Sequence, residues 1–363
     1  MQHYTELSIP AQTAYAQLAD VANGLELVRD ISHLNGSFSK KTVRDLGYWY
    51  FSFRDIDGVL RQLYVGPVSD AVDAAVARAK AGAQGPAQRT EPLVKAAVAL
   101  GCAHGIPKHV RAVRRLSEYG FFRAGGVLVG THAFIAIGNM LGVKWASGES
   151  TTDVDFAHAG KNMSLALPAN IKIDVHEALS SFEAGFIPLV QLGSSGQGGK
   201  TVASYKLSGD AEFQIDFLTS QHRGGDALVS IPHLNIVLQP LRFMEFSLEK
   251  VEQAVLMDRN GVSVVVNIPS PARYAVHKLL VVGERSAAFQ TKVSKDVQQA
   301  AALIDWYLAY RADELADAWA DAHSRGPGWQ KRLNQGLAAL TRAHAPLTQR
   351  LAPYLPKYVP KAS

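Results

Sequence analysis

The sequence contains a single cysteine, Cys102, among 363 residues. One cysteine cannot form a disulfide within the chain, which excludes a fold held together by internal disulfides and fits a reducing compartment. Its neighbour Ala103 is small and apolar, a setting that is typical of a packed thiol rather than of a nucleophile. Neither a disulfide scaffold nor a cysteine-based metal site is expected.

Long apolar runs are also missing. No stretch is long enough to span a bilayer, and the first residues, Met1 to Leu7, lack the basic and apolar blocks of a secretory signal. We therefore expect a cytoplasmic protein with no membrane partner. The 12 histidines form no His-Glu-x-x-His pattern and have no pair of cysteines beside them, so a structural zinc ion is not expected.

Charge is moderate and slightly basic. Hydrophobic residues make up 47% of the chain and charged residues 19%, which indicates a globular protein with two or three structural units. The formal net charge is +5 and the pI is about 9.1. This excess permits contact with nucleotides or nucleic acid without requiring it.

Three aspartates stand on segments with the pattern of β-strands. Asp153 and Asp155 lie in Thr-Asp-Val-Asp-Phe, and Asp216 lies in Phe-Gln-Ile-Asp-Phe. Because side chains alternate between the two faces of a strand, these aspartates are predicted to face outward while the intervening Val, Ile and Phe side chains enter the core. Carboxylate oxygens suit Mg²⁺ or Mn²⁺, which commonly bind a few carboxylates together with substrate phosphates. The pattern indicates phosphoryl or nucleotidyl transfer.

A glycine turn precedes the aspartates. Residues 125–129 have the composition of a buried strand, and a helical pattern begins at Thr131, so Gly130 and Thr131 are predicted to form the corner with Thr131 as the N-cap. Helix N-termini attract anions because their first backbone N–H groups lack partners within the helix. His132, which follows directly, is interpreted as a helix surface residue.

These segments, in this order, resemble the motif of the nucleotidyltransferase superfamily, whose palm is like that of DNA polymerase beta. The resemblance covers Gly-Gly-Val-Leu-Val-Gly-Thr-His-Ala-Phe, Thr-Thr-Asp-Val-Asp-Phe and Glu-Phe-Gln-Ile-Asp-Phe, within residues 125–218. It is nearest to a group of bacterial nucleotidyltransferase-fold proteins, and more distant to the nucleotidyltransferase toxins of abortive-infection systems. Thr131 departs from the commoner Ser or Gly but keeps a hydroxyl.

The resemblance implies roles for these residues. Asp153 and Asp155 would bind two metal ions, and Asp216 would ligate the second and help to activate the attacking hydroxyl. The Gly130-Thr131 turn would hold a nucleotide phosphate. A nucleoside triphosphate is the substrate that this family would use.

A second segment, residues 269–279, also resembles the corresponding part of the bacterial group. Ser270 and Pro271 are predicted to open a helix, as N-cap and first helical residue. By the resemblance, Lys278 with Arg273 would clamp the triphosphate, because a leaving pyrophosphate needs positive charge nearby. The alternative is a basic helix side that faces water.

Three other features are interpreted as structural. Asp55 and Asp57 lie beside a glycine between two alternating runs, which predicts a hairpin turn. Residues 193–201 almost spell a P-loop, but a strand-like run follows instead of a helix, so a hairpin tip is predicted. Asp174 is expected at the surface or as a helix cap.

The predicted fold class is α+β, a mixed sheet flanked by helices. We divide the chain into an N-terminal helix and β-hairpin unit (1–100), a nucleotidyltransferase catalytic core (101–230) and a C-terminal strand and helical region (231–363). In the first unit, a helix from Ser69 to about Gly82 should be followed by a linker at 82–90. In the last, helices over 291–351 should be broken at Gly326.

The hairpin of the first unit places lysines beside aromatic residues, at Lys40, Lys41 and residues 47–53. Such a surface can hold single-stranded RNA by stacking and by phosphate contacts. The alternative is an aromatic hairpin that packs on its neighbour.

The predicted function is the metal-dependent transfer of a nucleoside monophosphate from a nucleoside triphosphate to a hydroxyl acceptor, with release of pyrophosphate. The acceptor classes left open are RNA, protein and small molecules. Two alternatives stand beside this hypothesis: a nucleotide- or RNA-binding adaptor that transfers nothing, and the toxin of a toxin–antitoxin pair.

Overall fold

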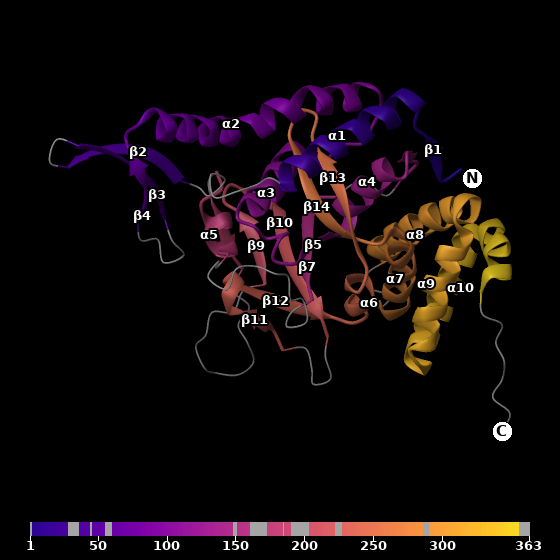
Figure 1. Ribbon diagram of the computed structural model, residues 1–363. Coiled ribbons are helices and arrows are strands. Elements are labelled where there is room, and N and C mark those ends of the chain that lie inside the picture. Colours follow the sequence, from indigo (N-terminus) through magenta and orange to yellow (C-terminus); the bar gives the residue numbers. More distant parts are fainter. Residues whose placement is uncertain are drawn as a thin grey trace.

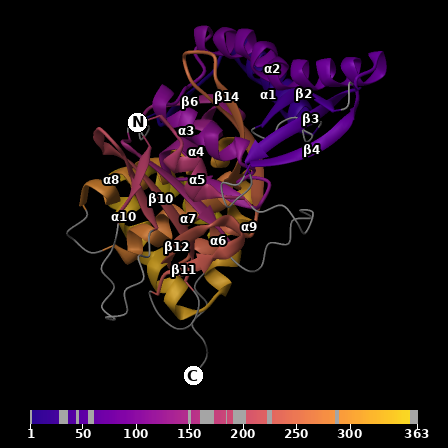
Figure 2. The ribbon, with the colours of Figure 1, turned by 90° about the vertical axis from the view of Figure 1, so that its left-hand side faces the viewer.

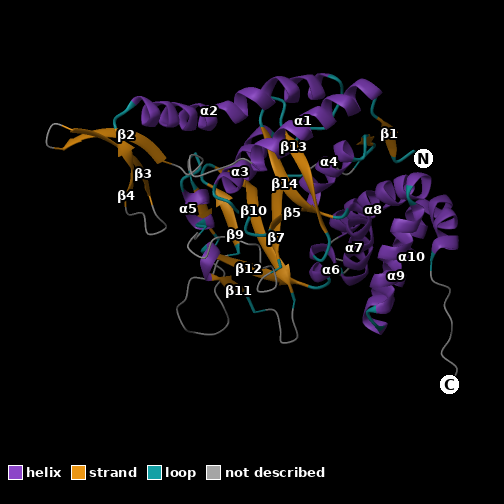
Figure 3. Cartoon of the chain, in the orientation of Figure 1, coloured by secondary structure: helices purple, strands orange, loops and turns teal. Residues whose placement is uncertain are grey.

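The computed structural model describes residues 2–27, 36–43, 46–54, 60–147, 151–159, 173–183, 185–189, 203–221, 227–285 and 290–355. Helices surround a mixed β-sheet, so the predicted α+β class is confirmed (Figures 1 and 3). Helices α1 and α2 lie across one side of the molecule in both views of the ribbon (Figures 1 and 2). Within the described ranges, no helix is long and apolar enough to cross a membrane.

The central sheet has seven strands in the part of the chain that the structure describes. Its path runs β11-β12-β10-β7-β5, while β9 pairs with β10 and with β8. Strands β7 and β10 are parallel neighbours, and β5 runs antiparallel to β7. The strands are β5 (Gly126–Val129), β7 (Asp153–His158), β8 (Phe186–Pro188), β9 (Ser204–Leu207), β10 (Asp210–Ser220), β11 (Val229–Ile231) and β12 (Ile236–Leu241).

Apolar residues on β7 and β10 decide which face of the sheet is buried. The side chains of Val154, Phe156, Phe213, Ile215 and Phe217 have no exposed surface, as predicted. Burying each contributes roughly 1.5–3 kcal/mol, and a slip of one residue would turn all of them to the other face. The register that keeps the aspartates on the outer face therefore follows from the core.

Two helices flank the strand β5. Helix α3 (Pro107–Glu118) precedes it, and helix α4 (Gly130–Met140) follows it without a loop. Their apolar side chains belong to the same core cluster as Val154 and Phe156. Short elements complete this region: β6 (Val143–Trp145), which pairs with β1 (Tyr4–Glu6), and α5 (Val175–Ser180), for which Asp174 is the N-cap. The capping role expected for Asp174 is thus confirmed.

The C-terminal part begins with an antiparallel hairpin and ends in packed helices. The hairpin is β13 (Val251–Met257) and β14 (Ser263–Pro269), and the short helix α6 (Met244–Leu248) precedes it. The packed helices are α7 (Pro271–Glu284), α8 (Gln290–Tyr310), α9 (Ala312–Ser324) and α10 (Pro327–Leu351). Ser270 is the residue before α7, Pro271 is its first residue, and Gly326 separates α9 from α10, all as predicted.

The predicted linker at 82–90 is wrong. Helix α2 runs without a break from Asp70 to Ala99 and lies alongside α1 (Ile9–Leu27) (Figure 1). Glycine and proline in its middle disfavour a helix locally. Tertiary packing overrides that preference, because Val76 near one end and Val94 near the other are both buried.

Three antiparallel strands form a separate sheet, which we call the N-terminal arm: β2 (Gly36–Val43), β3 (Leu46–Arg54) and β4 (Leu60–Pro67). The predicted hairpin of β3 and β4 is confirmed, although its turn at 55–59 lies outside the described residues, as does the whole P-loop-like segment 193–201. The arm lies at the end of α2 that is farthest from helices α8 to α10 (Figure 1).

Two glycines allow helices α7 and α10 to touch backbone to backbone. A Cβ atom at Gly336 would collide with the backbone carbonyl of Leu279, and one at Gly283 would collide with the carbonyl of Arg332. These contacts set the separation of the two helices and hence the position of α7, which faces the aspartates.

We predict that Gly336→Ala destabilises the protein by about 1–3 kcal/mol, because overpacking outweighs the better helix propensity of alanine. Gly24→Ala is the matched control, since Gly24 is an exposed helical glycine with nothing within 4 Å of an added Cβ. That variant should gain about 0.5–1 kcal/mol. Urea unfolding followed by circular dichroism measures both, and equal gains in the two variants would contradict the close crossing.

Candidate active site

The outer face of the central sheet brings the three predicted aspartates together. Asp155 on β7 pairs in register with Asp216 on β10, and Asp153 pairs with Gln214. Paired residues on neighbouring strands are roughly 4.8 Å apart and point to the same side. All three aspartates are partly exposed, opposite the buried apolar face. The predicted common face is confirmed, and Gln214 joins it by donating from Nε2 to Asp216 Oδ1 at 2.7 Å.

Asp155 lies in the most charged part of this face. Burial raises the pKa of its carboxyl group to about 6, and the negative charge of Asp216 adds to the rise. The ammonium of Lys278 opposes that rise, and Asp153 reinforces it. A carboxyl group with these neighbours gains from any cation that comes between it and Asp216.

Gly130 is required at the corner that follows β5. Its φ is +64°, and a Cβ atom there would overlap the Asp155 carboxylate. Helix α4 therefore begins beside Asp155, as the sequence predicts. The predicted N-cap is wrong: the cap position is Val129, and Thr131 lies inside the first turn with only 4% of its surface exposed. With the left-handed glycine at the corner, the cap lies two residues earlier than the hydroxyl pattern indicates.

His132, in the same turn, is buried rather than exposed on the helix surface. Its Nε2 lies 3.2 Å from Nδ1 of His109, whose ring stacks on Phe213. Burial lowers the pKa of His132 to about 3 and that of His109 to about 4. Both rings are therefore neutral near pH 7 and offer no positive charge to a phosphate.

Helix α7 contacts the glycine corner directly. The Tyr274 hydroxyl is 2.8 Å from the carbonyl oxygen of Gly130 and 3.0 Å from Gln299 Oε1. One turn further, Lys278 donates to Asp296 Oδ1 at 2.7 Å, and Arg285 lies 3.0 Å from the other oxygen of Asp296. Burial alone would lower the pKa of Lys278, but the Asp296 carboxylate reverses this and raises it. Lys278 is thus a fixed positive charge near Asp155.

A second lysine near the aspartates, Lys295 on α8, escaped the sequence analysis. Burial lowers its pKa, and so does the charge of Lys278, whereas the charges of Asp155 and Asp153 act to raise it. Its ammonium is therefore near enough to Asp155, Asp296 and Asp153 to interact with their charges. Only the packing of α8 on α7 reveals this, since no motif surrounds Lys295 in the sequence.

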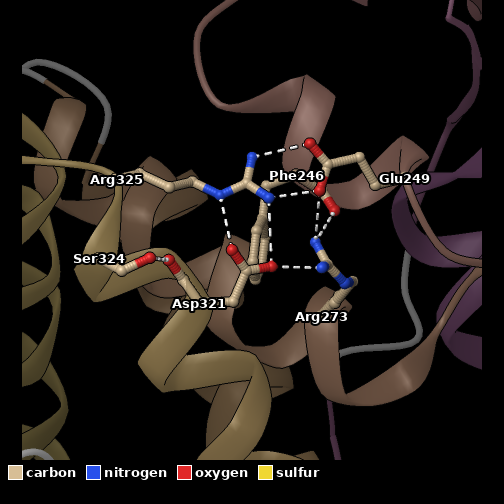
Figure 4. A network of polar contacts seen from close by, with 6 residues as sticks. All are labelled: Phe246, Glu249, Arg273, Asp321, Ser324 and Arg325. Atoms are coloured by element: carbon tan, nitrogen blue, oxygen red, sulfur yellow. Dashed lines mark hydrogen bonds and ion pairs between the residues drawn. The ribbon is translucent and has the colours of Figure 1, made fainter.

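Arg273, the other residue predicted to clamp the triphosphate, points elsewhere (Figure 4). Its guanidinium donates to the carbonyl oxygen of Phe246 at 2.9 Å and to Glu249 at 3.1 Å, and also pairs with Asp321. Arg325 bonds to the same two carboxylates. Five residues along a helix correspond to a rotation of about 140°, so Arg273 and Lys278 cannot share one face. The network joins α6, α7 and α9. Of the two residues predicted to clamp the triphosphate, the structure therefore brings Lys278 near Asp155 but not Arg273.

The three aspartates offer oxygen donors, the type of ligand that magnesium prefers. Within the described residues, no three Asp, Glu, His or Cys side chains lie close enough together to hold a metal among themselves. Magnesium usually takes one or two protein carboxylates and completes its shell with water and substrate phosphates. Asp155 and Asp216, side by side and mutually repelling, fit that pattern, with Asp153 as the adjacent acidic group.

The paired carboxylates thus lie beside a glycine corner at a helix start and near Lys278, which Asp296 holds in place. The comparisons name the family: a nucleotidyltransferase family model matches residues 107–324, more than half of the chain, so the protein belongs to this family. The matched part contains the three aspartates, Gly130, Thr131, Arg273 and Lys278. It also crosses the boundary that the sequence analysis placed at residue 230.

Other comparisons add little. An antigenic nucleotidyltransferase-like protein from Paracoccidioides brasiliensis, known from a crystal structure, shares 18% identity with this chain. The alignment covers 63% of this chain and 92% of that one, with a TM-score of 0.29. An overlap at this level does not establish a common fold. Curated proteins gave no match.

We predict that Asp155→Asn stabilises the protein at pH 8 in the presence of a chelator, by up to about 3 kcal/mol. The folded pKa of about 6 lies above the ordinary value of 3.8, so the folded state holds the extra proton between these values. The Asp155 carboxyl group makes its full contribution to the free energy of unfolding below pH 3.8, where it is protonated, and loses that contribution as the pH rises through 6. The gain from asparagine should therefore vanish near pH 4.

Urea unfolding at the two pH values measures this effect. The exposed Asp317 offers the control, because Asp317→Asn should change stability by less than about 0.5 kcal/mol at either pH. A loss of stability in Asp155→Asn at pH 8 would show that the carboxylate is held by favourable contacts instead of being repelled.

Proposed function

We propose that the protein transfers a nucleoside monophosphate from a nucleoside triphosphate to a hydroxyl acceptor and releases pyrophosphate. Membership of the nucleotidyltransferase family supports the reaction type. The observation that carries the proposal is the register of Asp155 with Asp216 beside the Gly130 corner. Two like charges held at adjacent positions raise the energy of the free site, which a cation and a triphosphate would lower together.

The triphosphate would lie between the aspartates and the lysines. The first turn of α4 offers backbone N–H groups to a phosphate, and Tyr274 holds the Gly130 carbonyl in place. Lys278 is fixed by Asp296 and would supply constant positive potential. Lys295, on the next helix, would contact the phosphates that leave.

The chemical step is an in-line displacement at the α-phosphorus. An oxygen–phosphorus bond forms from the acceptor hydroxyl, and the bond between the α-phosphorus and the bridging oxygen breaks with its electrons going to pyrophosphate. Asp216, oriented by Gln214, would accept the proton of the hydroxyl. Positioning of the two reactants contributes much of the rate in such reactions.

Asp155 and Asp216 are the residues that would hold Mg²⁺ or Mn²⁺, with Asp153 as the adjacent acidic group that adds to the negative charge at the site. When bound, the metal would neutralise the developing charge on the phosphates and favour the ionised form of the acceptor hydroxyl. All other parts of the proposal concern residues of the chain itself.

Asp153→Ala and Asp216→Asn are each expected to lower transfer at least about 100-fold, because each removes a group that stabilises charge in the transition state. The assay incubates pure protein with each α-labelled triphosphate, Mg²⁺ and cell lysate, and follows label in RNA, protein and small molecules. Released pyrophosphate is measured in parallel.

The matched control is Asp174→Asn. Asp174 caps α5 by accepting from the Glu177 backbone nitrogen, and asparagine is an equally good cap. That variant should transfer label at the wild-type rate. Full activity in Asp153→Ala, or no labelled product and no pyrophosphate from the wild type with any triphosphate, would contradict the proposal and favour a binding protein.

Lys295→Ala is expected to raise the KM for the triphosphate and to lower kcat, because a charge near the leaving phosphates acts in both the bound and the transition state. Lys292→Ala, which removes an exposed lysine one turn earlier on α8, is the control and should leave both constants unchanged. Steady-state kinetics over a range of triphosphate concentrations separates the two. Equal kinetics for both variants would remove Lys295 from the site.

A further inference from the structure

The N-terminal arm has two unlike faces. Helix α2 packs on one face: Trp49 and Phe51 are buried there, and the Trp49 indole nitrogen donates to Asp73 at 2.5 Å. The face that points away from α2 carries the alternate residues of the three strands. Register places Tyr48 and Tyr50 of β3 beside Lys41 of β2 and Tyr64 of β4 on that face.

The three tyrosines of this outer face form one cluster. The ring centroids of Tyr64 and Tyr50 are 5.8 Å apart, and those of Tyr64 and Tyr48 are 6.0 Å apart. The Tyr64 side chain is 58% exposed, so the cluster presents ring surface to the solvent. Lys41 lies over the Tyr50 ring at 5.3 Å and donates to Gln62 Oε1 at 2.5 Å. We call these five residues the tyrosine face.

The charges of the arm indicate which class of partner fits the tyrosine face. The three strands contain no Asp or Glu, and Lys41 is the basic residue that lies on the tyrosine face; Lys40 lies on the other face, where it pairs with Asp73 of α2. Exposed aromatic rings beside a lysine, on strands without carboxylates, match the needs of a single nucleic acid strand, whose bases stack and whose phosphates are negative. A second copy of the chain fits less well, since adjacent lysines on the edge strand β2 oppose pairing with another edge.

We propose that the tyrosine face binds single-stranded RNA and presents its end as the hydroxyl acceptor. The role of the RNA end as acceptor rests on the proposed function, whereas the binding of RNA does not. The arm lies on the β9 side of the central sheet, away from helices α8 to α10 (Figure 1). It also precedes the part of the chain that matches the family, which begins at Pro107. The tyrosine hydroxyls can form hydrogen bonds with 2′-hydroxyl groups, which favours RNA over DNA.

Binding is tested by fluorescence anisotropy with an end-labelled single-stranded RNA of about 15 nucleotides, a length within the range that aromatic basic surfaces cover. The competitors are DNA of the same sequence and the RNA duplex. The full chain is used without nucleotide and in EDTA, and Asp153→Ala is measured beside the wild type. Both proteins should bind the single strand more tightly than either competitor.

The double variant Tyr50→Ala/Tyr64→Ala should weaken binding at least about 10-fold, because stacking on an aromatic ring contributes about 1–3 kcal/mol per base. Tyr50→Phe/Tyr64→Phe keeps the rings and should retain most of the binding while losing part of the preference for RNA over DNA, which separates stacking from a failure to fold. Lys41→Ala should lower the slope of log affinity against log salt by about 0.7. Tyr354→Ala, at an exposed tyrosine near the end of the described chain, and Lys95→Ala are the matched controls and should bind as the wild type does.

Several results would overturn the inference. They are no binding of the single strand by the wild type, equal binding of the DNA, and unchanged binding by the double alanine variant. Concentration-dependent dimers that the double variant abolishes would assign the face to a second copy instead. Loss of transfer in Asp153→Ala with intact RNA binding leaves this inference standing, whereas transfer to other acceptors without RNA binding removes this inference alone.

Discussion

The pairing of β7 with β10 is the constraint on which the site depends. The parallel register sets Asp155 beside Asp216. The buried residues that alternate with them along each strand fix this register, because a slip by one residue would expose Phe156 and Phe217. The core thus forces two carboxylates together at a point where neither gains from the other. Burial first, and then the negative charge of Asp216, raise the pKa of Asp155 to about 6.

Positive charge near Asp155 and Asp216 offsets the repulsion between their carboxylates. Lys278 is anchored by Asp296, which Arg285 also contacts, so the positive charge that faces Asp155 is held by a second layer of ion pairs. Tyr274 links the same helix to the Gly130 carbonyl. Helix α7 in turn owes its position to the glycine crossing with α10 and to the network of Arg273 and Arg325 with Glu249 and Asp321. Residues far from the aspartates therefore set the geometry of the site.

Features of the site that follow a local sequence pattern could be predicted from the sequence. Alternation along the strands placed Asp153, Asp155 and Asp216 on one face, and the glycine marked the corner before α4. Prediction failed where packing decides the outcome: at Thr131, which a left-handed Gly130 moves into the helix, and in the middle of α2, which packing at both ends keeps helical. Lys295 has no motif of its own, and the separate directions of Arg273 and Lys278 follow only from counting turns along α7.

The central claim is that Asp155 and Asp216 together bind a divalent cation with a nucleoside triphosphate. Titration with Mn²⁺, followed by electron paramagnetic resonance in the presence of a triphosphate whose α–β bridge cannot be cleaved, tests it most directly. The account predicts that the wild type binds the ion and that Asp155→Asn and Asp216→Asn each weaken its binding at least about 10-fold. Equal Mn²⁺ binding by the wild type and both variants would contradict it.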